Sequence, residues 1–307
     1  MTPSERRLRL GTRGSPLALW QARWVAGALA ATGVDEPELV VVKTTAERFP
    51  DQNITQLGVG IFTKELDDAL LREEIDLAVH SLKDVPTTIV AGLTLGAVPE
   101  RESPWDALIS TSHTRFIDLP PGAKIGTSSP RRQAQLLARR PDLEVVPLRG
   151  NVQTRLRKVE EQGLAGTILA HAGLRRLETE ELITELFDCE TLVPAVAQGA
   201  LGIVIRDDDT SMAATVAPLE HAPSRQRVTA ERTFLRHLRG GCQVPVGALA
   251  ELDTNMERLQ LTAVIGSIDG TICLRGQDEA LPSHAESLGT RLAEKLLGEG
   301  AGELLSS

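Results

Sequence analysis

Apolar and polar positions repeat along the chain with two spacings, and the order in which these spacings alternate predicts the fold class. Short apolar runs are typical of strands buried in a parallel sheet, whereas apolar residues three and four positions apart are typical of covering helices. Strands are predicted at residues 8–11, 39–43, 77–79, 124–126, 144–148 and 167–170. Helices are predicted between them, at residues 16–32, 62–74, 130–140 and 153–161. This alternation predicts an α/β fold with mainly parallel sheets.

The chain contains a short internal repeat. Residues 10–16 read Leu-Gly-Thr-Arg-Gly-Ser-Pro, and residues 125–130 read Ile-Gly-Thr-Ser-Ser-Pro. In each copy a strand passes through a tight turn into a helix that the serine caps and the proline begins. The repeat predicts two similar α/β lobes.

The last third of the chain has a different pattern, typical of a small α+β domain. A helix capped by Ser224 is predicted to about residue 239, and a final helix is predicted from Ser283, with Glu286 completing a capping box. Between them, an Asp-Gly hairpin signal at 269–270 separates two of the predicted strands, which are 244–252, 259–266 and 271–275. We therefore predict three domains: residues 1–99 with 198–217, residues 103–194, and residues 220–307.

Composition and charge exclude several classes of function. The formal net charge is −9, and only 3% of the residues are aromatic, which disfavours nucleic acid as a partner. An anionic ligand must then be met by a local basic cleft. No apolar stretch is long enough for a membrane span, and the charged N-terminal residues do not resemble a signal peptide. We expect a cytoplasmic protein that binds neither membrane nor nucleic acid.

The cysteines and histidines predict neither a disulfide framework nor a metal site. Cys189, Cys242 and Cys273 are odd in number, widely spaced and without a Cys-x-x-Cys pair, which fits a reducing compartment. The histidines are scattered and lack the spacing of metal ligands.

Polar and basic residues follow the predicted strands at their carboxyl ends, where ligands bind in parallel α/β sheets. Free amides and small hydroxyls at the helix start 126–132 suit an anion, and guanidinium groups suit carboxylates. An alternative is that Ser129 and Pro130 only begin a helix and that the neighbouring arginines are solvated. Because basic residues from several segments gather at the same sheet edges, we favour a ligand with many carboxylates. These polar and basic residues are Arg13, Ser15, Ser81, Lys83, Asp84, Thr127, Ser128, Ser129, Arg131, Arg132, Arg149, Asn151, Arg155, Arg175 and Arg176.

Asp84 and Cys242 are the candidates for chemistry, and each also has a structural interpretation. Asp84 precedes a Val-Pro pair, so it is either a turn aspartate or a carboxylate that stabilises a cationic intermediate or moves a proton. Cys242 follows a Gly-Gly pair on a predicted loop, so it is either a small buried apolar residue or a reactive thiol facing a cleft.

Six segments, in order and spread over nearly the whole chain, resemble the signature segments of porphobilinogen deaminases. They read Gly-Thr-Arg-Gly-Ser-Pro-Leu-Ala-Leu-Trp-Gln at 11–21, His-Ser-Leu-Lys-Asp-Val-Pro at 80–86, Gly-Thr-Ser-Ser-Pro-Arg-Arg-Gln at 126–133, Leu-Arg-Gly-Asn-Val at 148–152, Pro-Ala-Val-Ala-Gln-Gly at 194–199 and Gly-Gly-Cys-Gln-Val-Pro at 240–245. The resemblance implies two lobes similar to type II periplasmic binding proteins, with mainly parallel sheets, and a small C-terminal α+β domain that carries the cofactor cysteine. It also implies a transferase that joins four porphobilinogen molecules head to tail on a dipyrromethane primer, releasing ammonia and then hydroxymethylbilane.

The resemblance also assigns roles residue by residue. Asp84 matches the catalytic aspartate, and Cys242 holds the dipyrromethane cofactor through a thioether. The cofactor-binding positions are Ser81, Lys83, Thr127, Ser128, Ser129, Arg131 and Arg132. The substrate-binding positions are Arg13, Ser15, Gln21, Arg149, Asn151, Arg155, Arg176 and Gln198. A monomer without a metal, which passes its product to uroporphyrinogen-III synthase, is implied as well.

The chain departs from the family's pattern in a few places. The segment over the active site usually reads Gly-Gly-Lys-Gly before a phenylalanine, whereas residues 57–62 read Leu-Gly-Val-Gly-Ile-Phe and lack the lysine. The usual Gly-Asp pair upstream is Ala46-Glu47, and a common glutamate is Val204. We interpret the site as intact and the lid segment 45–62 as altered.

Other classes of protein stay open on the sequence alone. A non-catalytic two-lobed module that binds a polycarboxylate explains the arginines, but neither the segment around Cys242 nor the third domain. A different transferase with Cys242 as nucleophile lacks a histidine visibly placed to activate the thiol. A transcriptional effector domain is disfavoured because no helix-turn-helix segment comes before the lobes.

Overall fold

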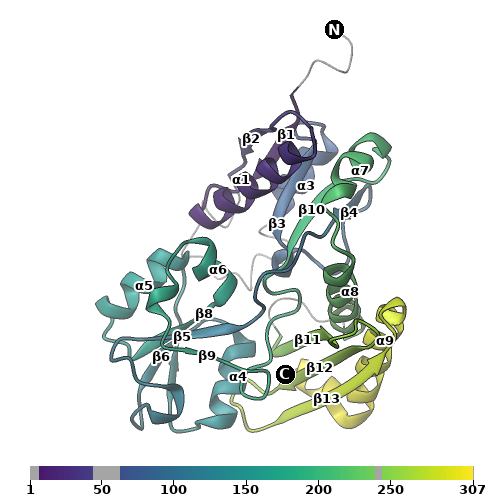
Figure 1. The fold of residues 1–307 in the computed structure, drawn as a ribbon. Coiled ribbons are helices and arrows are strands. Elements are labelled where there is room, and N and C mark those ends of the chain that lie inside the picture. The colour runs from purple at the N-terminus through teal and green to yellow at the C-terminus, as the bar shows by residue number, and fades with distance from the viewer. Residues whose placement is uncertain (1–6, 44–62, 239–243, 307) are drawn as a thin grey trace. The chain divides into compact units, whose positions relative to one another are not determined.

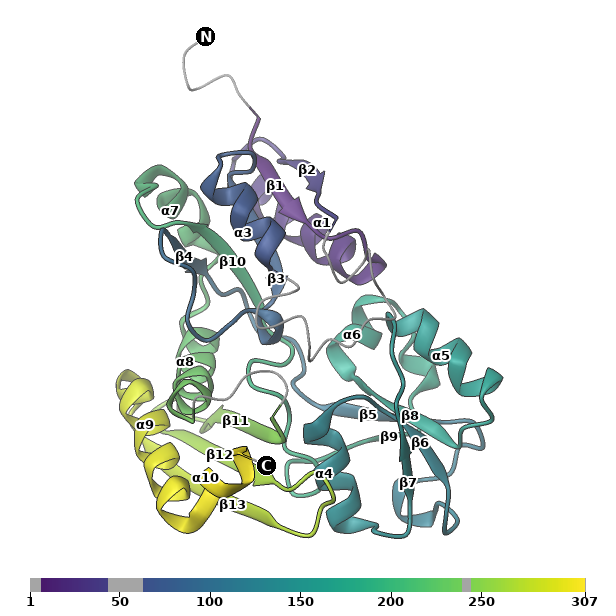
Figure 2. The same cartoon turned by 180° about the vertical axis from the view of Figure 1, so that it is seen from behind.

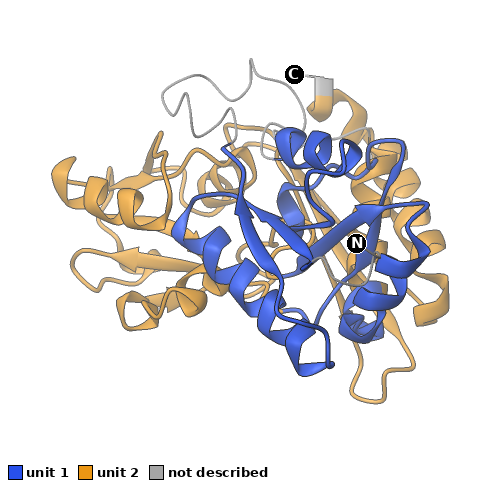
Figure 3. Ribbon diagram, turned by 90° about the horizontal axis from the view of Figure 1, so that it is seen from above, with its two compact units in different colours: residues 1–101, 200–225 blue, residues 102–199, 226–307 orange. Residues whose placement is uncertain are grey.

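The computed structural model describes residues 7–43, 63–238 and 244–306. The chain divides into two compact units, the first formed by residues 1–101 and 200–225 and the second by residues 102–199 and 226–307 (Figure 3). The first unit is therefore built from two stretches of sequence, with a complete sheet of the second unit encoded between them. The division into three domains at the boundaries given above stays a prediction.

The first unit is built on a five-stranded sheet covered by helices (Figure 1). Its elements are β1 (Arg9–Thr12), α1 (Pro16–Ala31), β2 (Glu38–Val41), α3 (Lys64–Leu71), β3 (Leu77–Ser81), β4 (Leu93–Ala97), β10 (Leu201–Arg206) and α7 (Thr210–Val216). The strand order is β2-β1-β3-β10-β4. β1 pairs in parallel with β2 and β3, whereas β10 pairs antiparallel with β3 and β4. Among these strands β10 alone is therefore reversed.

Apolar side chains fill both faces of this sheet because successive strand residues point to opposite sides. On one face α1 contributes Val25 and Leu29 to a buried cluster. On the other face α3 contributes Leu66 and Leu70, which share a second cluster with Val204 of β10. Val204 is thus a core residue, 1% exposed.

The second unit contains a sheet of the same design. Its elements are β5 (Asp106–Ser110), β6 (Lys124–Gly126), α4 (Pro130–Arg139), β7 (Glu144–Val146), α5 (Val152–Glu161), β8 (Gly166–Ala170), α6 (His171–Arg176) and β9 (Glu185–Leu186). The order is β7-β6-β8-β5-β9, with β6 parallel to both of its neighbours and β5 antiparallel to both of its own. The reversed strand again lies fourth in the sheet. The α/β fold class with two similar sheets is confirmed, and each sheet is mixed, because one of its five strands runs against the other four.

The remainder of the second unit is an antiparallel meander with helices, as predicted for the C-terminal part (Figure 2). Its elements are α8 (Ala222–His237), whose first four residues are counted with the first unit, β11 (Val246–Leu252), β12 (Leu259–Gly266), β13 (Cys273–Ala280), α9 (Ala285–Leu296) and α10 (Gly302–Ser306). The hairpin between β12 and β13 packs against α4. A Cβ on Gly270 would lie 2.5 Å from the backbone nitrogen of Ala138, and Gly270 has φ +74°, so both the space and the backbone require glycine there.

Two predicted helix caps are wrong. α8 begins at Ala222, two residues before the predicted cap, and the Oγ of Ser224 instead accepts a hydrogen bond from the backbone nitrogen of Arg101 at 2.8 Å. α9 begins at Ala285 after a short 3-10 turn that contains Ser283, and its N-cap residue His284 makes no side-chain capping bond. A serine followed by a glutamate three residues later was therefore an insufficient signal.

The caps of the internal repeat are confirmed. Ser15 caps α1 by accepting a hydrogen bond from the backbone nitrogen of Ala18, and Ser129 caps α4 by accepting one from that of Arg132. In both helices proline is the first residue.

Candidate functional site

A pocket of about 70 Å³ lies at the carboxyl ends of β1 and β3 in the first unit. The polar residues that line it are Arg13, Ser15, Gln21, His80, Ser81 and Asp84. Arg13 and Ser15 follow β1, whereas Asp84 ends the 3-10 turn Leu82–Asp84 that follows β3. The structure thus brings together five residues that the sequence assigned to the site, at the sheet edge where ligands were expected.

Gln21 and Ser81 form the polar wall of this pocket. The Nε2 of Gln21 donates to the Oγ of Ser81 at 2.8 Å, and Gln21 is only 2% exposed. This bond joins the second turn of α1 to the end of β3. Lys83 and Asp84 lie in the 3-10 turn directly after Ser81, so one rigid segment supplies several of the predicted residues.

His80 lines the same pocket and was missed as a site residue. Burial, together with the positive charge of Arg13, lowers the pKa of His80 to about 4, so the imidazole is neutral at pH 7. It is 5% exposed, and within the described residues its Nε2 has no hydrogen-bond partner. The available signal was a titratable residue directly after the apolar run 77–79, at the sheet edge where ligands were expected.

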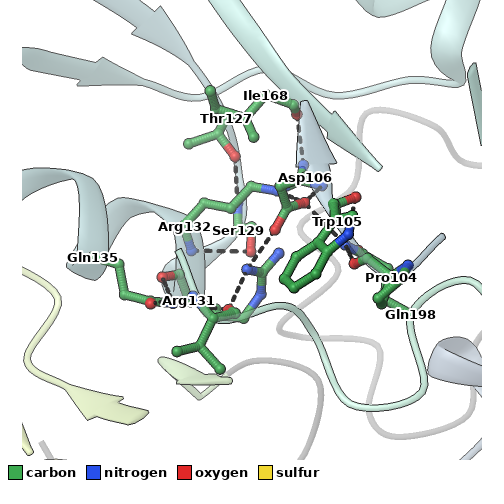
Figure 4. Close-up of polar contacts among 11 residues, drawn as sticks. Pro104, Trp105, Asp106, Thr127, Ser129, Arg131, Arg132, Gln135, Ile168 and Gln198 are labelled. Carbon is green, nitrogen blue, oxygen red and sulfur yellow. Dashed lines mark hydrogen bonds and ion pairs between the residues drawn. The ribbon is translucent and has the colours of Figure 1, made fainter. Parts of the chain in front are cut away.

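In the second unit, Arg131 and Arg132 of α4 turn inward onto a carboxylate that was also missed, that of Asp106 (Figure 4). The Nη1 of Arg131 lies 2.7 Å from Oδ2 of Asp106, and the Nη2 of Arg132 lies 2.6 Å from Oδ1. Asp106 is fully buried. Burial alone raises the pKa of Asp106, but the charges and hydrogen bonds of the two guanidinium groups hold it well below its ordinary value. The alternative that these arginines are solvated is wrong.

Gln198 belongs to the same cluster. Its Nε2 donates to the backbone oxygen of Pro104 at 2.8 Å and to Oδ1 of Asp106 at 3.1 Å. The turn before α4 lies beside the cluster: the Oγ1 of Thr127 accepts from the backbone nitrogen of Ser129 at 3.2 Å, and Ser128 is exposed. A helix start with small hydroxyls and a buried positive cluster can hold an anion.

The other predicted binding residues of the second unit also follow strands. Asn151 caps α5 by accepting from the backbone nitrogen of Thr154 at 2.9 Å, and the Nε of Arg155 donates to the backbone oxygen of Gly150 at 2.8 Å. Arg149 is half-buried in the turn between β7 and α5. In α6, burial lowers the pKa of Arg176 to about 10, which leaves the side chain charged at pH 7.

Cys242 and the whole lid segment 45–62 lie outside the described residues. Within the described part of the chain, no group of three or more histidine, cysteine or acidic side chains is arranged to hold a metal ion. None of the helices in that part is both long enough and apolar enough to span a bilayer.

Comparison with known proteins gives a consistent result along the whole chain. Residues 8–214 match the family model described as the porphobilinogen deaminase, dipyromethane cofactor binding domain, and residues 225–298 match that of the porphobilinogen deaminase C-terminal domain. A porphobilinogen deaminase of Carboxydothermus hydrogenoformans is 46% identical, over 96% of this chain and 95% of the relative. One from Desulforudis audaxviator is 49% identical, over 98% of this chain and 97% of the relative. A solved lipoprotein of the YaeC family from Enterococcus faecalis is a more distant likeness, with 15% identity over 70% of this chain and 91% of that chain and a TM-score of 0.41.

Proposed function

The chain belongs to the porphobilinogen deaminase family, and from this premise we propose which of its residues carry out the reaction. The activity is the stepwise head-to-tail condensation of porphobilinogen on a covalent dipyrromethane primer, with release of ammonia and finally of hydroxymethylbilane by hydrolysis. The observation that carries the proposal is the pocket in which Asp84 lies with Arg13, Ser15, Gln21 and Ser81.

Asp84 is the catalytic residue of the proposal. When ammonia leaves porphobilinogen, the pyrrole is left with a positive charge, and a carboxylate at the pocket wall stabilises that charge. The same carboxylate receives the proton that must leave the pyrrole ring after the new bond has formed, and can pass it on. The neutral state of His80 supports this role, because a protonated imidazole in the same pocket would repel the charged pyrrole.

The residues of each unit fit the dipyrromethane cofactor, which carries several carboxylates. In the second unit the donors are Thr127, Ser128, Ser129, Arg131 and Arg132, at the start of α4 and in the positive cluster around Asp106. In the first unit they are Ser81 and Lys83, and Cys242 supplies the thioether bond. When bound, the cofactor supplies the free α-carbon of a terminal pyrrole, to which the next unit is joined.

The remaining arginines bind the carboxylates of the substrate and of the growing chain. Arg13, Ser15 and Gln21 do so in the first unit. In the second unit the proposed residues are Arg149, Asn151, Arg155, Arg176 and Gln198. Each added unit brings an acetate and a propionate, which explains why an acidic protein keeps arginines after so many strands.

We further propose that the protein acts in the cytoplasm as a monomer and that uroporphyrinogen-III synthase consumes its product. The cysteines support a reducing compartment: the described ones, Cys189 and Cys273, are both free thiols.

Denaturing intact mass spectrometry of the purified protein tests the proposal. We expect a mass excess equal to two deaminated porphobilinogen units, located on the peptide that contains Cys242, and its loss in Cys242→Ser. The bare chain mass, persisting after incubation with porphobilinogen, would contradict the proposal and favour a non-catalytic module that binds a polycarboxylate. A normal bound primer in Cys242→Ser would contradict the site of attachment alone.

A further inference from the structure

The cluster around Asp106 carries an excess of positive charge. One carboxylate faces two guanidinium groups, and Arg131 and Arg132 are only 4% and 5% exposed. Within the described residues no second carboxylate forms an ion pair with either arginine. An unbalanced buried charge is costly unless a counter-ion shares it. The cluster is therefore incomplete without an anion.

The two arginines differ in how many of their donors the protein already uses. Arg132 donates through Nε and Nη2 to Asp106, at 3.0 and 2.6 Å, and through Nη1 to the backbone oxygen of Ile168 at 2.6 Å. Arg131 donates through Nη1 alone, to Asp106 at 2.7 Å and to the backbone oxygen of Val193 at 2.8 Å. Within the described residues the Nε and Nη2 of Arg131 make no hydrogen bond. These two groups form the edge of a guanidinium that binds a carboxylate with two parallel bonds.

Both carboxylate oxygens of Asp106 are already engaged within the protein. Its Oδ1 accepts from Arg132 and from Gln198, and its Oδ2 accepts from Arg131. It begins β5, a central strand of its sheet, so its position is fixed by the backbone pairing on both sides. Gln135 also helps to fix Arg131. The side-chain amide of Gln135 donates to the backbone oxygen of Val193 and accepts from the backbone nitrogen of Val193. Arg131 donates to that same backbone oxygen.

We propose that Asp106 is a positioning residue, which holds Arg131 so that the Nε–Nη2 edge binds one carboxylate of the dipyrromethane cofactor. Arg132 and Gln198 hold Asp106 in turn. The inference rests on the proposed function, which identifies the ligand as the dipyrromethane cofactor. The hydrogen bonds of the cluster show which arginine binds the ligand and which one holds Asp106.

The test compares cofactor loading in variants of the full chain. Asp106→Asn keeps the shape of the side chain but removes its charge, so the ion pair that positions Arg131 is lost. We expect the porphobilinogen concentration that half-loads the apo-protein to rise roughly 10- to 100-fold, the worth of one charge-assisted hydrogen-bond pair. Molecules that do carry the cofactor should turn over at about the wild-type rate, since no reacting atom is touched. A merely structural role would lower the unfolding temperature without this separation of loading from turnover.

Asp142→Asn is the matched control. Asp142 pairs with Arg140 just beyond the other end of α4, with contacts of 2.6 and 2.7 Å, so the control also breaks an arginine–aspartate pair but leaves the cluster intact. It should load and turn over as the wild type does. Should Asp106→Asn fail to fold, Asp106→Glu replaces it, because it keeps the charge but displaces the carboxylate by one methylene.

The outcomes separate the two proposals. If the wild type acquires the cofactor mass and a folded Asp106 variant loads at the same concentration, the positioning role is wrong and the proposed function stands. If the wild type never acquires that mass, the proposed function itself fails. Raised loading concentrations in an Asp106 variant, with Asp142→Asn unchanged, support the inference.

Discussion

Two strand-to-helix turns with nearly the same sequence are used differently by the two units. In α1 the two residues after the first proline are Leu17 and Ala18, and they line an open pocket. After the turn that begins α4, the corresponding residues are Arg131 and Arg132, and both are buried against a carboxylate. The backbone design and the serine cap are shared. What differs is whether another strand of the same sheet supplies a counter-charge, so a common turn can end either beside an open pocket or in a buried ion cluster.

The comparison is sharpest between Asp84 and Asp106. Asp84 lines the pocket, and replacing it should abolish function without removing the fold. For Asp84→Ala we expect turnover of porphobilinogen to fall by about 10²- to 10⁴-fold, the contribution of a positioned acid–base group. Single-turnover kinetics on protein that already carries the cofactor, with the unfolding temperature as control, check this. Near-normal turnover would assign the chemistry to another residue.

Asp106→Ala should lower stability as well as cofactor loading. Removing the fully buried partner leaves two guanidinium groups without a counter-charge, so the free energy of unfolding of the second unit should fall by about 3–5 kcal/mol. Urea unfolding followed by the fluorescence of Trp105 measures it, with Trp20 and Trp24 of the first unit replaced by phenylalanine. A loss under 1 kcal/mol would mean that water or a bound anion takes over the role of the carboxylate.

The two units should also respond to acid in different ranges. The pKa of His80 is lowered from 6.5 to about 4, so on acidification the unfolded chain binds this proton first. The stability of the first unit should therefore fall by about 3 kcal/mol as the pH drops from 6.5 to 4, at 1.36 kcal/mol per pH unit. The pKa of Asp106 is depressed below its ordinary 3.8, so its stabilisation is complete above that value and is lost only at lower pH.

His80→Gln tests this assignment. The variant should lose the decline between pH 6.5 and 4 while keeping most of its stability at pH 7.5. With Trp105→Phe as background, Trp20 and Trp24 report on the first unit alone. An unchanged acid slope would place the responsible group elsewhere.

The smallest effect should come from the shared caps. Ser15→Ala and Ser129→Ala each remove one capping bond, so each should lower the stability of its own unit by about 1 kcal/mol. Ser128→Ala is the control, because that side chain is exposed, and it should change stability by less than about 0.5 kcal/mol. Equal losses in all three variants would show that the caps are not the shared element.

Local signals in the sequence predicted the first elements of each lobe. A serine followed by proline fixed the starts of α1 and α4, because the cap depends only on neighbouring residues. The failure at Ser224 has the opposite cause. Ser224 binds the backbone of Arg101, more than a hundred residues away, and a distant partner of this kind leaves no trace in the local pattern.

The residues of the candidate site divide in the same way, into those that a local pattern predicts and those that depend on distant contacts. Arg13, Ser15, Ser81 and Asp84 could be assigned because a parallel sheet brings the residues after its strands to one edge, whereas Gln21, inside α1, was assigned by the family resemblance alone. Asp106 could not, because its partners come from α4 and from the segment around Gln198, and only the fold brings them together. Whether an arginine meets a ligand or an internal carboxylate depends on such long-range contacts.

The reversed strand of the first sheet has a consequence for synthesis of the chain. β10 lies between β3 and β4, yet it is encoded after every strand of the second unit's first sheet. As the polypeptide leaves the ribosome, β5 to β9 are all available once residue 186 has emerged, whereas the earlier-made sheet still lacks an inner strand until residue 206. The sheet of the first unit therefore stays incomplete, with the facing edges of β3 and β4 unpaired, until β10 has been made. All five strands of the later sheet are available before that point.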